Sequence, residues 1–173
     1  MINALKDSLW KQFGASIDML NNAIALYPED YWNTNKKIFY QAYHVLVFLD
    51  YYLTIPPPEN FSSSLPFTIT EPSGMPEHAI DDVVPNRLYS KEELLDYLQL
   101  SREKCRSVIA GLTEEKIQER WIEEEGGMNY AVLEILLYNM RHVQHHAAQL
   151  NMLLRQELNK ATGWVARVED DVV

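Results

Sequence analysis

Two histidines, His142 and His146, stand four residues apart in a long segment without proline or glycine, a pattern that predicts a helix. Residues at this spacing lie close to one face of a helix, so both imidazoles can bind one ion. Two ligands from one helix do not complete a site. The remaining histidine in a strongly helical, apolar segment is His44, and we therefore predict a metal site made of His44, His142 and His146.

A histidine on an apolar helix face is more often a hydrogen-bonded core residue than a ligand, and for His44 alone that interpretation would stand. The pair on one helical face is what favours a metal. His78 lies in a proline-rich connection and is expected at the surface. His145 points away from both predicted ligands, so we expect it in solvent or at an interface, with a role toward substrate or a ligand as the alternative.

Three neutral imidazoles leave coordination positions open for water or substrate, which is typical of catalytic zinc. Nickel and iron(II) accept the same ligands. A carboxylate-bridged dinuclear site requires Glu-x-x-His pairs on two helices, and the sequence has none. Because Val143 follows His142, the His-Glu-x-x-His motif of zinc proteases and its general-base glutamate are absent, which excludes peptide hydrolysis by that route.

Each ligating ring also needs a partner for its second nitrogen, and Asn139, Arg141 and Gln149 are candidates one turn away. Each of them fits an exposed polar position equally well. Tyr40 and Trp121 could line a substrate pocket, although aromatic residues at helical spacing belong more often to the core. No residue of the sequence is singled out as catalytic.

The first half of the chain predicts two helices that could position His44. Apolar residues three and four apart indicate a first helix from Ile2 that closes at Pro28. A second helix, apolar on nearly every side, is expected to be capped by Asn33 or Thr34 and to end near Thr54. Such a helix should be central or shared with a partner chain.

A third helix begins at a capping box formed by Ser90 and Glu93. The acidic stretch from residue 113 to 127 is expected to be a solvated turn with some helix. A fourth helix runs from Tyr130 to about Leu158. Four helices with a short first connection and a long crossover between the second and third predict an all-α four-helix bundle.

Residues 55–89 form that long connection, which starts with three prolines and is either a functional cover or a disordered connector. Its apolar side chains, Phe61 and Phe67 among them, favour packing. Residues 159–173 form a tail. It either packs back over the bundle, since Trp164 is costly to expose, or stays acidic and flexible.

The whole chain has 173 residues and is 47% hydrophobic, which predicts a single domain over residues 1–173. A formal charge of −10 disfavours binding to nucleic acid or to an anionic membrane. The chain has one cysteine, Cys105, which we expect to be buried. With no apolar leader after Met1, this cysteine usage suits a cytoplasmic protein.

The segment His142-Val143-Gln144-His145-His146-Ala147-Ala148-Gln149-Leu150, together with Tyr43-His44-Val45-Leu46, resembles the DinB-like superfamily, which includes the YfiT-type metal-dependent hydrolases. The resemblance implies a metal-binding four-helix bundle, often a homodimer, with His44, His142 and His146 as its ligands. Family members commonly carry Gly-Gln after the double histidine, whereas Ala148-Gln149 stands here, a change that leaves the ligands untouched.

This resemblance spans thiol-S-transferases that use low-molecular-weight thiols, a thiol-dependent isomerase and members without known activity. It implies a metal-dependent thiol-S-transferase or hydrolase-like enzyme that acts on a small molecule, with zinc or nickel, or else iron, as the divalent metal. The alternative is a non-catalytic, stress-associated dimeric binding protein with a structural or vestigial site. A fourth protein ligand would indicate the structural site, and an open position the enzyme.

Overall fold

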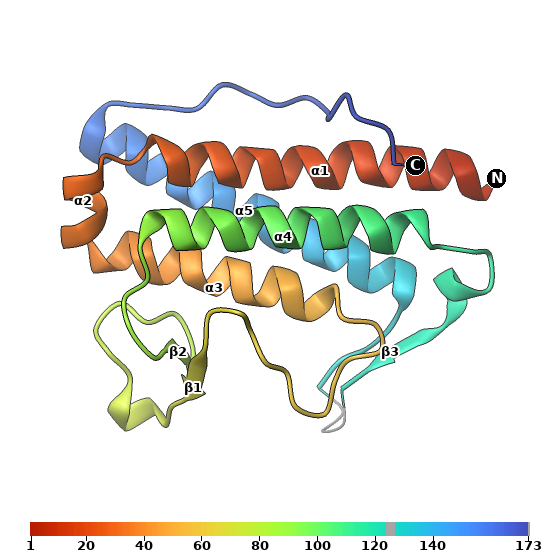
Figure 1. Ribbon diagram of the computed structural model, residues 1–173, viewed down its shortest axis with the longest axis horizontal. Helices are drawn as coiled ribbons and strands as arrows, with labels where there is room; N and C mark the ends of the chain where they lie inside the picture. Colours follow the sequence, from red (N-terminus) through yellow and green to blue (C-terminus); the bar gives the residue numbers. More distant parts are fainter. Residues whose placement is uncertain (124–126, 173) are drawn as a thin grey trace.

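The computed structural model describes residues 1–123 and 127–172. The protein is mostly helical, and the α-helices in the described ranges are α1 (Ile2–Leu26), α2 (Glu29–Thr34), α3 (Lys36–Tyr52), α4 (Lys91–Ala110) and α5 (Val132–Leu158). The four long helices run roughly along one direction, and the short α2 lies at one end of them (Figure 1). Both α1 and α3 pack against α4 and α5, so α3 and α5 are neighbours that can share a site.

Two small antiparallel hairpins lie in the connections, on the side of α3 that faces away from α1 (Figure 1). The first pairs β1 (Phe67–Ile69) with β2 (Val83–Pro85), and the 3₁₀ turn η1 (Pro72–Gly74) lies between them. The second pairs β3 (Arg120–Ile122) with β4 (Asn129–Ala131), after the 3₁₀ turn η2 (Lys116–Gln118). The connections on both sides of α4 therefore carry more regular structure than their sequences predict.

The start of α4 confirms the predicted capping box. The Ser90 hydroxyl accepts a hydrogen bond from the Glu93 amide, and the Glu93 carboxylate accepts one from the Ser90 amide. This reciprocal arrangement satisfies two backbone donors that the first helical turn leaves without intrahelical partners. The capping box fixes the end of the connection between α3 and α4, which spans residues 53–90 in the structure.

The predicted start of α3 is wrong by one or two residues. Its cap is Asn35, whose side-chain oxygen accepts from the Ile38 amide at 3.3 Å, and neither Asn33 nor Thr34 has this role. The physical reason is α2, which continues the chain as a helix immediately after Pro28. Thr34 is its last residue and bonds back to the backbone of that helix.

The interior between the long helices is largely apolar, and many of its large side chains are fully buried. Examples are Trp10, Phe13 and Ile17 of α1, Leu46 and Leu49 of α3, and Val143 and Leu150 of α5. The connection after α3 covers a further face of that helix, since the Tyr43 hydroxyl donates to the Leu65 carbonyl at 2.7 Å and its ring stacks on Tyr89. This cover explains why α3 is apolar on nearly every side.

The C-terminal segment packs back along the outside of α1 (Figure 1). Its anchor is Val168, which is buried and whose amide donates to the Lys11 carbonyl at 3.2 Å. The sequence suggested that Trp164 would pack the tail onto the bundle. In the structure Trp164 is 76% exposed, so this side chain does not hold the tail in place. Cys105 is buried, as expected.

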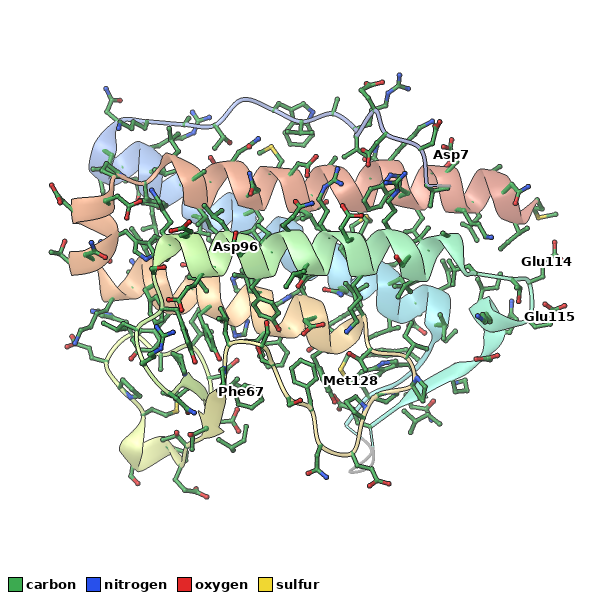
Figure 2. The ribbon with its side chains drawn as sticks, viewed as in Figure 1. Asp7, Phe67, Asp96, Glu114, Glu115 and Met128 are labelled. Atoms are coloured by element: carbon green, nitrogen blue, oxygen red, sulfur yellow. The ribbon has the colours of Figure 1, made fainter. Side chains whose placement is uncertain are left out.

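The acidic turn after α4 is at the surface, where Figure 2 shows the side chains of Glu114 and Glu115 near one end of the molecule. Glu124, Glu125 and Gly126 of the same predicted turn lie outside the described residues. Among the helices that the structure describes, none has the length and apolarity needed to cross a bilayer.

Candidate metal centre

The structure brings the three predicted ligands together between two neighbouring helices. His44 projects from the middle of α3, while His142 and His146 project from successive turns of α5. One ring nitrogen from each histidine lies within 4.8 Å of the other two. The Nε2 atoms of His44 and His142 are 3.0 Å apart.

This spacing suits one shared ion. Two nitrogens bound to zinc at about 2.0–2.1 Å in a tetrahedral shell are about 3.4 Å apart, which is close to the 3.0 Å between His44 and His142. Two further ring nitrogens, Nδ1 of His142 and Nδ1 of His146, are buried without a hydrogen-bond partner. Each of these two rings therefore has a nitrogen that no described protein group satisfies, and three imidazoles are a donor set that divalent transition metals accept.

The surroundings of His142 and His146 keep both imidazoles neutral, the form that can bind a metal. The pKa of His142 is lowered from 6.5 to about 3, first by burial and then by the neighbouring His146 and His44. Burial likewise lowers the pKa of His146 to about 4. Both rings are therefore neutral at pH 7, and only a neutral imidazole can give a lone pair to a metal.

Asp81 is a site residue that the sequence reasoning missed. Its Oδ2 lies 2.5 Å from Nδ1 of His44, the ring nitrogen that faces away from His142. Its other oxygen accepts from the Val83 amide at 3.0 Å, so the first residues of β2 hold the carboxylate in place. Asp81 is 37 positions from His44 and lies in a connection without periodicity, so no local signal links the two residues.

Three polar residues of α5 were candidates to hydrogen-bond the second ring nitrogens of the histidines, and the structure places them differently. Gln149 accepts a hydrogen bond from Gln41 of α3 at 2.6 Å, which ties α5 to α3. Asn139 is buried, but its amide donates to the Leu49 carbonyl of α3 at 3.0 Å, so it ties the two helices together instead of orienting a histidine. Arg141 is exposed.

The other two histidines are outside the cluster. His145 is exposed on α5, in agreement with the expectation that it faces solvent or an interface. His78 lies in the connection between β1 and β2 with a φ of 75°, and its side chain is 44% exposed. Neither residue belongs to the group of three that could hold an ion.

Aromatic side chains surround one side of the cluster. The ring of Phe48 lies 4.8 Å from that of His44, and Tyr52 stands edge-on to His142 at 6.1 Å, measured between ring centroids. Trp121 is fully buried behind Tyr52 and donates its indole N–H to the Thr54 carbonyl, so it belongs to the core and not to a pocket wall. Tyr40 is half-buried and packs edge-on against Phe39.

A mostly helical fold with three histidines gathered between two helices defines a protein with a candidate metal site. Residues 12–150 match the DinB superfamily, which is most of the chain and includes all three histidines, and the protein therefore belongs to that superfamily. Neither the curated proteins nor the solved structures compared with the chain gave a match.

Proposed function

We propose that the protein is a metal-dependent enzyme in which His44, His142 and His146 hold one divalent transition metal, zinc or nickel before iron. The chemistry that we propose is thiol-S-transfer, with a low-molecular-weight thiol as co-substrate, or a hydrolase-like reaction on a small molecule. Superfamily membership and the histidine cluster support the metal site. The reaction is the inference that the experiments below test.

The observation that carries this proposal is the composition of the cluster. Among the residues that the structure describes, it contains three imidazoles and no cysteine or carboxylate. Asp81 approaches the cluster but bonds to the outer nitrogen of His44, so it does not close the coordination shell. Three neutral ligands with no fourth protein donor are the arrangement of catalytic and not of structural zinc.

A divalent ion held by these rings would act as a Lewis acid and supply an activated nucleophile at neutral pH. The protein's own groups prepare the place for it. His44 keeps 13% of its side-chain surface exposed, which leaves an approach from solvent. Phe48 and Tyr52 present apolar edges to the histidines and limit the water around them.

The proposal includes the architecture that the superfamily implies. We propose that α1, α3, α4 and α5 form a four-helix bundle in one domain over residues 1–173, with the 53–90 segment as its crossover. We also propose a homodimer in the cytoplasm. The exposed apolar residues Leu137 and Met152 on α5 are candidates for its contact surface.

The first experiment measures metal content in protein purified without a metal-affinity tag or chelator. We expect about one zinc or nickel ion per chain, and a loss of at least tenfold in metal affinity in His142→Ala, because two imidazoles remain. His145→Ala is the matched control, since His145 is exposed and neighbours the same helix turn. No bound metal after reconstitution would contradict the proposal.

A protein that holds metal is then tested with small electrophiles in the presence and absence of low-molecular-weight thiols. Thiol-dependent turnover that disappears in His142→Ala and survives in His145→Ala supports the transferase. Turnover without added thiol supports the hydrolase-like reaction. Metal without turnover in either assay would leave a structural site as the better interpretation.

A further inference from the structure

We propose that Asp81 is a positioning residue that fixes His44 for metal binding and thereby links the β1–β2 hairpin to the occupancy of the site. This inference rests on the proposed metal site. It concerns a residue outside the three-histidine set, contributed by the 53–90 connection.

The hydrogen bond between His44 and Asp81 has a defined direction. An ionised carboxylate can only accept, so the 2.5 Å contact with Asp81 requires that Nδ1 of His44 carries the proton. The lone pair is then on Nε2, the atom that lies 3.0 Å from His142 inside the cluster. Asp81 thus selects the tautomer of His44 that can bind an ion at the centre, and it makes that nitrogen more basic.

The β1–β2 hairpin holds Asp81 in place. Its Oδ1 accepts from the Val83 amide, and Val83 is paired with Ile69 across the hairpin. The Asp82 carbonyl accepts from the Thr70 amide at 2.9 Å and extends the same pairing. The carboxylate is therefore the link through which an ordered hairpin reaches a histidine on α3.

The coupling between the metal and the hairpin is reciprocal. If a docked Asp81 strengthens metal binding, bound metal must stabilise the docked hairpin by the same free energy. Asp81 is 25% exposed at its side chain, so the contact lies near the surface where the hairpin can separate from α3 without unfolding the interior. The connection then acts as a cover whose order depends on the metal.

Asp81→Asn is a sharp test because asparagine has the same shape. If its oxygen keeps the Val83 amide, its NH₂ group faces Nδ1 of His44 and favours the wrong tautomer, with the proton on Nε2. Asp82→Asn is the matched control, since this adjacent residue is exposed and contributes its backbone to the hairpin. Both variants remove one negative charge from the same turn.

We expect zinc affinity, measured by competition with a chromogenic chelator, to fall about 10–100-fold in Asp81→Asn and less than twofold in Asp82→Asn. The visible spectrum of the protein saturated with Co²⁺ should shift in Asp81→Asn alone, which a purely structural contact would not cause. Zinc should slow amide exchange over residues 67–85 in the wild type and in Asp82→Asn, and this slowing should disappear in Asp81→Asn.

Equal zinc affinity and equal cobalt spectra in wild type and Asp81→Asn would overturn the inference while leaving the metal site intact. Equal losses in both variants would also overturn it, because a general charge effect would explain them. A wild-type chain that binds neither zinc nor cobalt would instead refute the proposed function on which the inference rests.

Discussion

His142 and His146 are placed where a protonated imidazole would lose its hydration and face other histidines. Burial is the larger cause of their lowered pKa values, and the neighbouring rings add to it. In the absence of metal the native state therefore needs both rings neutral, whereas the unfolded chain can protonate them freely. The residue-level consequence is a dependence of stability on pH that can be measured without knowing the substrate.

Stability of the metal-free protein should fall as the pH drops below about 6.5. Between that value and folded pKa values of about 3 for His142 and about 4 for His146, the unfolded chain binds more protons than the native state, so the free energy of unfolding rises with pH. We expect a loss of roughly 2–4 kcal/mol between pH 6.5 and pH 5, measured by urea unfolding with a chelator present.

The double variant His142→Gln, His146→Gln should flatten this dependence, because it removes the two groups that must stay neutral. His145→Gln changes the exposed histidine next to them and should keep the wild-type slope. A slope that is unchanged in the double variant would mean that other groups, and not this pair, cause the acid sensitivity.

At the scale of elements, local signals allowed prediction and distant contacts did not. The α4 start could be predicted because Ser90 and Glu93 are three residues apart and each side chain bonds to the other residue's backbone amide. The cap of α3 was misplaced because α2 follows a proline, which the pattern indicated as an end. The histidine pair on α5 was predictable from helical spacing, and Asp81 was not, since its partner is on another element.

Replacing Ser90 by alanine should cost about 1 kcal/mol of unfolding free energy, because the hydroxyl that accepts from the Glu93 amide is lost. Ser107→Ala is the matched control. It makes the same chemical change at an exposed position inside α4, where alanine is the better helix former. Urea unfolding at pH 7 compares the two, and equal effects would show that the capping box contributes nothing to stability.

At the scale of the molecule, the C-terminal segment joins helices that are distant in sequence. Arg102 of α4 bonds Asp18 of α1 at 2.8 Å and Asp170 of the tail at 3.3 Å. The indole N–H of Trp10 donates to the Asp170 carbonyl at 3.0 Å. The tail therefore lies along the outside of α1 and reaches Arg102 of α4, on the opposite side of the protein from the hairpins (Figure 1).

The tail has two apolar side chains, Val168 and Trp164, that should contribute very differently to stability. Val168 is 3% exposed and its methyl groups face Gly14, where an added Cβ would come within 2.9 Å of Cγ1, so the contact is closely packed. Val168→Ala should lower the free energy of unfolding by about 1–2 kcal/mol through the lost burial and the space left behind. Trp164→Ser removes a much larger side chain, yet it should change stability by less than about 0.5 kcal/mol because that ring is 76% exposed.

Urea unfolding of Val168→Ala and Trp164→Ser compares the two side chains. A larger loss of unfolding free energy in Trp164→Ser would mean that the indole and not Val168 holds the tail, which would require a second chain to cover the ring in solution.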